Sequence, residues 1–356
     1  MKKRLILLVL AGILAVELSS CGKKEVSSNH VQSVTSENSA ETSISEDETP
    51  ELSEEQPEQA ELPESEEIQG NITQNTEDAQ TQQQEQENSQ DNSSQTIASS
   101  VPISYADRQE IYLDGNWQYA GNSVIHSGAA VMYKAGGNRN GIVVGVNAGH
   151  GTSGGSSVKT LCHPDGSAKT TGGSTAAGAT KATAVSGGMT FNDGTTESSV
   201  TLRMAEILRD KLLAAGYDVL MVRDSSDVQL DNVARTVICN NVADCHISLH
   251  WDGDGLNYDK GSFYISVPDG IKGMEPVASH WQQHNALGTS LVDGLRAQGC
   301  KIHGGGSMSI DLTQTSYSTI PSVDMELGNA CSDHSDETLN TQAEGLLQGI
   351  NNYFGK

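Results

Sequence analysis

The order of apolar and polar residues over positions 141–356 follows two periods in turn. Short apolar runs rich in β-branched residues predict strands at 141–148, 217–223, 245–251, 261–267 and 322–327. Between them, apolar residues recur every three or four positions and predict helices at 197–216, 232–242, 275–299 and 335–354. Because strands and helices alternate, the pattern favours a single α/β domain with a mixed, mostly parallel central sheet flanked by helices.

Two segments of this half of the chain have weaker patterns. Residues 101–140 contain short β-like pieces, EIYLDGNWQY and AAVMYKA, which predict an edge hairpin or a lead-in segment before the domain at 141–356. Residues 152–196 are rich in Gly, Ser, Thr and Ala and show no usable period. They predict a long, partly ordered surface loop, and a loop of that length inside a domain is usually functional.

The first residues read as an export signal. Basic residues at 2–4 precede an apolar stretch that is too short for a mature transmembrane helix. The sequence LSSC at 18–21 then resembles the lipobox of bacterial lipoproteins, which implies cleavage after residue 20 and a lipid on Cys21. The alternative is an ordinary secretory signal, at 1–20, followed by a chance cysteine.

Composition changes sharply between residues 21 and 100. Glu, Gln, Ser, Asn and Thr dominate, no aromatic residue occurs, and most of the chain's formal net charge of -25 is concentrated there. Such a segment buries too little to offset its ordering entropy, so it predicts a disordered acidic tether. The acidity makes nucleic acid an unexpected partner. The cysteines after Cys21 show no CxxC spacing and support no pairing.

Chemically reactive side chains stand at the ends of the predicted strands. His150 follows the strand at 141–148 between two glycines, His250 is near the end of CHISLHW, and Glu326 is near the end of SVDMEL. Glu197 opens the long helix. Ligands gather at the carboxyl ends of strands in α/β sheets, and two imidazoles with a carboxylate suit zinc with a fourth position free. From the residues alone, a turn-capping His150 or a Glu197 that only complements the helix dipole remains open.

Blocks of the sequence match a known order of motifs. They are NAGHGTSGG, GTTESSVTLRMAEILRDKLLAAGYDVLMVRDSSD, LDNVARTVICNNVADCHISLHWDG and IDLTQTSYSTIPSVDMELGN. Over residues 141–354 the chain resembles the zinc-dependent N-acetylmuramoyl-L-alanine amidases of the type 3 family, cell-wall hydrolases with a mixed α/β fold. The resemblance implies that His150, Glu197 and His250 hold one zinc ion and that Glu326 is the catalytic base.

The chain departs from that family at a few positions. Asn147 stands where the family usually has Asp, Trp251 follows the third ligand where a small residue is common, and Asn329 replaces a usual aromatic residue. The segment between His150 and Glu197 is also longer than in many relatives. None of these departures removes a ligand or the base.

The resemblance implies hydrolysis of the amide between N-acetylmuramic acid and the L-alanine of the peptidoglycan stem peptide. The alternatives are a wall-binding protein of the same fold without turnover, and a zinc peptidase acting within the stem. With Cys21 lipidated, the protein is expected on the outer face of the bacterial cytoplasmic membrane. The sequence leaves open whether a protein activator binds.

Overall fold

A computed structural model describes residues 104–356. The predicted signal peptide, Cys21 and the whole predicted tether at 21–100 lie outside the described residues. Strands of the main sheet are β1 (Gln109–Tyr112), β2 (Ala129–Tyr133), β3 (Val143–Ala148), β6 (Asp218–Met221), β7 (Cys245–Asp252), β8 (Ser262–Ser266), β9 (Ile302–Ser309) and β10 (Ser322–Asn329). Helices are α1 (Glu197–Ala214), α2 (Asn232–Val242), α3 (Val277–Ala297), α4 (Thr313–Tyr317) and α5 (Asp336–Phe354).

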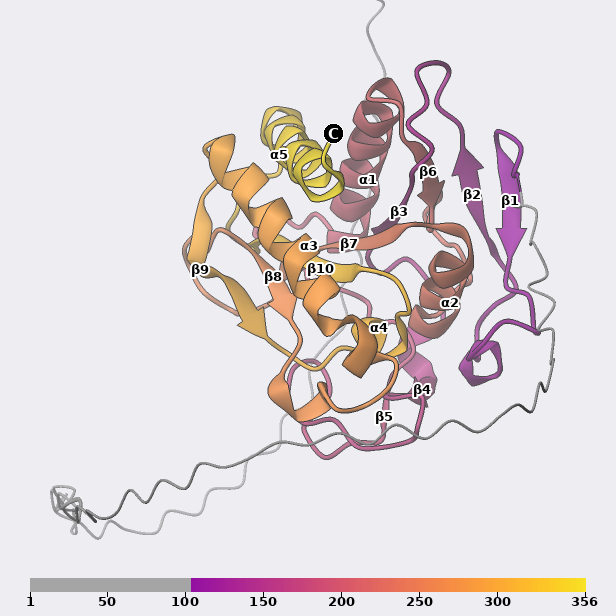
Figure 1. Cartoon of the computed structure of the whole chain (residues 1–356). Helices are drawn as coiled ribbons and strands as arrows, with labels where there is room; N and C mark the ends of the chain where they lie inside the picture. The colour runs from indigo at the N-terminus through magenta and orange to yellow at the C-terminus, as the bar shows by residue number, and fades with distance from the viewer. Residues whose placement is uncertain (1–103) are drawn as a thin grey trace, which may run out of the picture. The chain divides into compact units, whose positions relative to one another are not determined.

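The strands form one 8-stranded sheet in the order β1-β2-β6-β3-β7-β10-β8-β9 (Figure 1). The central neighbours β6, β3, β7 and β10 run parallel to one another, and β9 is parallel to β8. The remaining pairs, β1 with β2, β2 with β6 and β8 with β10, are antiparallel. The mixed, mostly parallel sheet flanked by helices that the sequence predicts is therefore confirmed.

Helices cover both faces of this sheet. The face packed by α1, α3 and α5 holds the larger core, and the face packed by α2 holds a second one (Figure 1). Along β6, Val219 and Met221 belong to the first core and Leu220 to the second, as the alternation of strand side chains requires. The parallel strands thus read as continuous apolar runs because both their faces are buried.

Helix α1 forms where the helical period predicts it. Its apolar stripe is buried, with Met204, Leu208 and Leu212 at 0% exposure. Each such side chain contributes about 1.5–3 kcal/mol relative to an exposed one. Thr196 occupies the N-cap position, and the chain turns after the helix at Gly216, which has a φ of 90°. This packing fixes the start of α1, and with it Glu197, against the sheet.

The segment 101–140 contributes the strands β1 and β2, which form the predicted edge hairpin and extend the main sheet through β6. Strand β9 and helix α4 were not predicted. Strand β9 has the sequence IHGGGSMS, whose glycines weaken any strand pattern, and α4 is only 5 residues long. Short 3-10 turns lie at η1 (Ala120–Asn122), η2 (Gly155–Ser157) and η3 (Asp269–Ile271).

The segment 152–196, predicted as a partly ordered surface loop, is mostly irregular and partly exposed, but it is more ordered than its sequence indicates. This insertion contains an antiparallel ribbon, β4 (Lys159–Leu161) with β5 (Lys181–Thr183), and it buries His163 completely. Nε2 of His163 lies 2.8 Å from Oδ1 of Asp311, and the backbone N–H of Thr170 donates to Oδ2 of Asp311 at 2.8 Å. A contact between residues so far apart in sequence produces no local period of apolar residues. The ordered structure of this segment could therefore not be predicted from its sequence.

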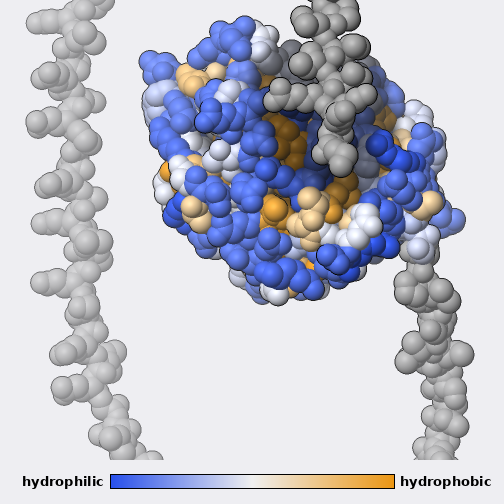
Figure 2. Space-filling model, turned by 90° about the horizontal axis from the view of Figure 1, so that it is seen from above, coloured by the Kyte–Doolittle hydropathy of each residue, from blue (hydrophilic) through white to orange (hydrophobic). Residues whose placement is uncertain are grey.

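The exterior agrees with a folded domain. Figure 2 shows a face that is mostly hydrophilic, with hydrophobic residues gathered near its centre. Among the helices described, none is long and apolar enough to cross a membrane. The five cysteines within the described range, Cys162, Cys239, Cys245, Cys300 and Cys331, are free.

Two histidines away from the metal centre are buried, His246 on β7 and His284 on α3. Burial, with the charge of Arg235, lowers the pKa of His246 to about 3. Burial, with the neighbouring His280, likewise lowers the pKa of His284 to about 3. The Nε2 atoms of His246 and His284 are buried without a hydrogen-bond partner among the described residues. Both imidazoles are therefore held neutral by the fold.

We expect the free energy of unfolding to fall in acid. The ordinary histidine pKa is 6.5, so between pH 6.5 and about 3 the unfolded chain binds more protons than the folded one. The contribution of these two histidines to the free energy of unfolding is fully present above pH 6.5. It is lost as the pH falls towards 3, by up to about 1.4 kcal/mol per pH unit for each histidine. In urea unfolding measured across this pH range, the free energy of unfolding of His284→Gln should depend less steeply on pH than that of the wild type. The exposed control His126→Gln should leave the slope unchanged, and an unaltered slope in the His284 variant would contradict the expectation.

Candidate metal centre

His150 lies in the turn after β3. It has a φ of 65°, the left-handed backbone that costs a non-glycine residue about 1–2 kcal/mol. Its imidazole is 6% exposed, and Nδ1 lies 2.9 Å from the carbonyl oxygen of Ser186. Because a carbonyl only accepts, Nδ1 carries the proton and Nε2 is the atom left free to bind a cation.

Glu197 is the first residue of α1 and is 2% exposed. Its Oε1 accepts a hydrogen bond from the backbone N–H of Trp251 at 3.0 Å, and its Oε2 accepts one from Met189 at 2.8 Å. The positive end of the helix dipole also favours a carboxylate at this position. The carboxylate is thus held in one orientation at the edge of the sheet.

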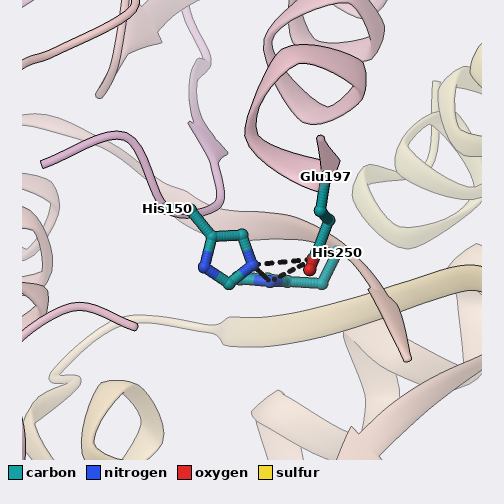
Figure 3. A group of neighbouring side chains, drawn as sticks. All are labelled: His150, Glu197 and His250. Carbon is teal, nitrogen blue, oxygen red and sulfur yellow. Dashed lines mark hydrogen bonds and ion pairs between the residues drawn. The ribbon is translucent and has the colours of Figure 1, made fainter. Parts of the chain in front are cut away.

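His250, on β7, completes a close group with His150 and Glu197 (Figure 3). Its Nδ1 lies 3.0 Å from Nε2 of His150 and 3.1 Å from Oε1 of Glu197. Nε2 of His150 lies 2.7 Å from Oε1 of Glu197. The structure therefore brings together, at one point, the three residues predicted from the sequence as metal ligands.

Glycines make this close approach possible. A Cβ added at Gly149 would lie 2.2–2.7 Å from the imidazole ring of His250. A Cβ at Gly188 would lie 2.8 Å from Cδ2 of His150 and 3.0 Å from Oε2 of Glu197. Gly149 thus leaves room for a neighbouring ring, while the sharp backbone turn is made at His150 itself.

The insertion at 152–196 forms part of the centre. Ser186 supplies the carbonyl bonded to His150, Met189 supplies the N–H bonded to Glu197, and Gly188 packs on both ligands. Nothing in the Gly- and Ser-rich pattern indicates these contacts. The only signal in the sequence is that the insertion joins one ligand to the next, so both its ends must lie near the site.

Glu326 stands beside His250. The two residues are register partners on the parallel strands β10 and β7, so their side chains leave the same face of the sheet, about 4.8 Å apart at the backbone. Oε2 of Glu326 is buried and has no hydrogen-bond partner among the described residues. A carboxylate oxygen left in this state is costly unless it faces a proton or a ligand.

Asp324 is a further acid at the site that the sequence interpretation missed. Its Oδ2 lies 3.9 Å from Nε2 of His250, and its Oδ1 is buried without a partner in the part of the chain that is described. The signal was present, because in SVDMEL the polar residues Ser322, Asp324 and Glu326 alternate with apolar ones and share one face.

The charges of these groups perturb one another. Burial would raise the pKa of Glu197, but its close contacts with the imidazoles of His150 and His250 outweigh burial and hold that pKa well below its usual value. Burial would lower the pKa of His250, but Asp324 and Glu197 raise it to about 10. Burial and the charge of Asp324 raise the pKa of Glu326 well above its ordinary value. Acidic groups therefore make the point favourable for a positive charge.

The donor set fits zinc. Two imidazole nitrogens and one carboxylate oxygen are ligands that zinc accepts in catalytic sites with an open position. Ligand bonds of about 2.0–2.1 Å in a tetrahedron separate the ligand atoms by about 3.3 Å. The separations of 2.7–3.1 Å found here need only a slight expansion. His150, Glu197 and His250 are the residues that would hold the ion.

Other histidines lie outside the centre. His163 and His284 are buried, and His280, His303 and His334 are partly exposed. His246 points to the same side of β7 as His250 but contacts Ser322 at 3.4 Å instead of the ligands.

We expect Gly149→Ala to weaken metal binding while the domain stays folded. The new methyl group would displace the ring of His250, and errors of this kind in ligand position typically cost 10–100-fold in affinity. Zinc affinity, measured by competition with a chelator, is the readout. Gly187→Ala is the matched control, because a Cβ at Gly187 would meet nothing within 4 Å. Equal affinity in both variants would contradict the expectation.

The fold and the site define an α/β protein with a candidate metal centre at one edge of its sheet. Residues 144–352 match the family described as N-acetylmuramoyl-L-alanine amidase. This match covers more than half of the chain. The chain therefore belongs to the N-acetylmuramoyl-L-alanine amidase family, and its family supports a peptidoglycan amidase activity.

Solved structures of amidases resemble the chain. The N-acetylmuramyl-L-alanine amidase Ami1 from Mycobacterium smegmatis has a TM-score of 0.51 at 20% identity, covering 62% of this chain and 99% of that one, and shows the same fold. Ami1 from Mycobacterium abscessus, in its apo form, has a TM-score of 0.49 at 22% identity, covering 60% and 99%. AmiC2 of Nostoc punctiforme has a TM-score of 0.44 at 17% identity, covering 62% and 100%. A comparison with curated protein sequences found no match.

Proposed function

We propose that the protein is a zinc-dependent hydrolase that cleaves the amide between N-acetylmuramic acid and the L-alanine of the stem peptide. The observation that carries this proposal is the convergence of His150, Glu197 and His250 at one buried point, with Glu326 on the adjoining strand. Membership of the amidase family supports the choice of substrate.

Each side chain has a distinct task in this reaction. Zinc, when bound, polarises the scissile carbonyl and makes a water more acidic. Glu326 takes the proton of the attacking water and returns it to the leaving nitrogen, as a base beside the reacting atoms can do. The Ser186 carbonyl orients the ring of His150 through the nitrogen that faces away from the ligand point, and the charge of Asp324, 3.9 Å from Nε2 of His250, attracts the ring of His250.

We also propose that the domain acts close to a membrane. Lipidation of Cys21 after cleavage of residues 1–20 would anchor the chain outside the cell, and residues 21–100 would tether the domain at 141–356, led by the segment 101–140. A globomycin-sensitive shift in mass and membrane fractionation of the full chain test this. A Cys21→Ala chain that still fractionates with membrane would contradict it.

Digestion of purified cell wall tests the activity. The full chain is incubated with wall and zinc, and the released fragments are analysed by mass spectrometry. New amino-terminal alanine on intact stem peptides is the expected result. Cleavage further along the stem would identify a peptidase, and binding of the wall without release would identify an inactive wall-binding protein. Either of these results would overturn the proposed function.

A further inference from the structure

Two arginines enclose the turn that carries His150. Arg223 follows β6 and is 0% exposed, and Arg235, on α2, is 1% exposed. Both guanidinium groups donate hydrogen bonds to backbone carbonyl oxygens of residues 148–150.

Arg223 joins two segments that carry metal ligands. Its Nε donates to the carbonyl oxygen of Ala148 at 3.0 Å, and its Nη2 to that of Gly149 at 3.0 Å. The same Nη2 also donates to the carbonyl of Ser198 at 2.8 Å and to Oγ1 of Thr201 at 2.9 Å, both in the first turns of α1. The turn before His150 is therefore tied to the helix that begins with Glu197.

Arg235 holds the same turn from the other side. Its Nη1 donates to the carbonyl oxygen of Ala148 at 3.1 Å, and its Nη2 donates to that of His150 at 2.6 Å. Nη1 also donates to Oδ1 of Asn147 at 3.0 Å, and Nη2 to Oγ1 of Thr152 at 2.9 Å. Carbonyl groups of three successive residues, 148 to 150, are thus fixed by the two forks.

The arrangement is costly. Within residues 104–356, the acceptors bonded to these two guanidiniums are neutral carbonyl, amide and hydroxyl oxygens. Burial and the charge of Arg223 lower the pKa of Arg235 to about 9. Two buried cations without a carboxylate destabilise a fold unless their hydrogen bonds are well satisfied. A fold that accepts this destabilisation next to the turn at His150 indicates that the two arginines have a function at the metal centre.

We propose that Arg223 and Arg235 are positioning residues for the metal centre. By bonding the carbonyls of residues 148–150, they fix the left-handed backbone at His150 and so the place where its Nε2 meets Glu197 and His250. The inference rests on the proposed zinc centre. It assigns the effect to the shape of the guanidinium fork and not to its charge, because positive charges beside a cation site weaken the attraction for the cation.

Lysine substitutions separate shape from charge. Arg223→Lys and Arg235→Lys keep a buried cation, but a single ammonium cannot reach the acceptors that each fork spans. In the full chain, we expect zinc to bind about 10–100-fold more weakly to each variant than to the wild type, by competition with a chelating dye. The visible spectrum of the Co²⁺-loaded protein should also change. Arg203→Lys, on the exposed side of α1 and 49% exposed, is the control that should change neither readout.

The outcomes are distinct. Folded lysine variants that bind zinc as tightly as the wild type, or more tightly, would overturn the inference, even if their melting temperatures fall. A wild-type chain that binds no zinc would instead remove the proposed function. If the lysine variants do not fold, Thr201→Val decides. It removes the hydroxyl that donates to the Gly149 carbonyl at 2.9 Å and accepts from Arg223, and should weaken zinc binding about threefold or more.

Discussion

Replacing Glu326 by glutamine is expected to lower the turnover of wall hydrolysis by roughly two to four orders of magnitude with zinc still bound. The amide keeps the size and the position of the side chain on β10, but it cannot accept the proton of the attacking water. The three ligands are unchanged. Turnover on purified wall and zinc content per chain, measured on the same preparation, are the two readouts.

The matched control for this variant is Glu337→Gln on the exposed start of α5, which should keep full turnover. A Glu326→Gln chain that retains more than about a tenth of wild-type turnover would show that another group acts as the base. Asp324 is the carboxylate then to be tested, because it lies on the same face of β10. A variant that loses zinc along with turnover would show that Glu326 contributes to binding the metal.

The fold could be predicted where packing is local and periodic. Strands β3, β6, β7 and β10 and helices α1, α2, α3 and α5 are visible in the sequence because each buries a repeating apolar set. Strand β9 could not be predicted, since its order comes from pairing with β8 and not from its own Gly-rich sequence. The insertion at 152–196 owes its order to contacts such as that between His163 and Asp311, which span 148 positions.

The candidate metal centre likewise has parts that the sequence predicts and parts that it does not. Its three ligand candidates could be found from strand ends and block order, because the side chains themselves carry the chemistry. Its support could not, since Ser186, Met189 and the carbonyls of residues 148–150 act through backbone atoms that any residue possesses. Nothing in the sequence around Arg223 and Arg235 indicates that their partners are neutral carbonyls, which only the structure shows.

Removing one of the three proposed ligands tests how the centre contributes to zinc binding and to the stability of the fold. In the metal-free chain Glu197 is buried, and contacts with the two imidazoles hold its pKa low. We expect His250→Ala to leave this carboxylate poorly paired and to remove a ligand at the same time. Zinc affinity should fall at least about 100-fold, and turnover should be lost, since two remaining ligands do not suffice for a catalytic site.

Thermal unfolding separates this effect from general damage. A ligand that binds only the folded state stabilises it by about 4 kcal/mol at a thousand times its Kd, so zinc should raise the melting temperature of the wild type clearly. The same zinc concentration should leave His250→Ala unchanged, whereas His303→Ala, a partly exposed histidine on β9, should respond like the wild type. A full zinc-dependent shift in the His250 variant would show that the ion binds elsewhere, because the cluster at the sheet edge would then lack one of its three donors.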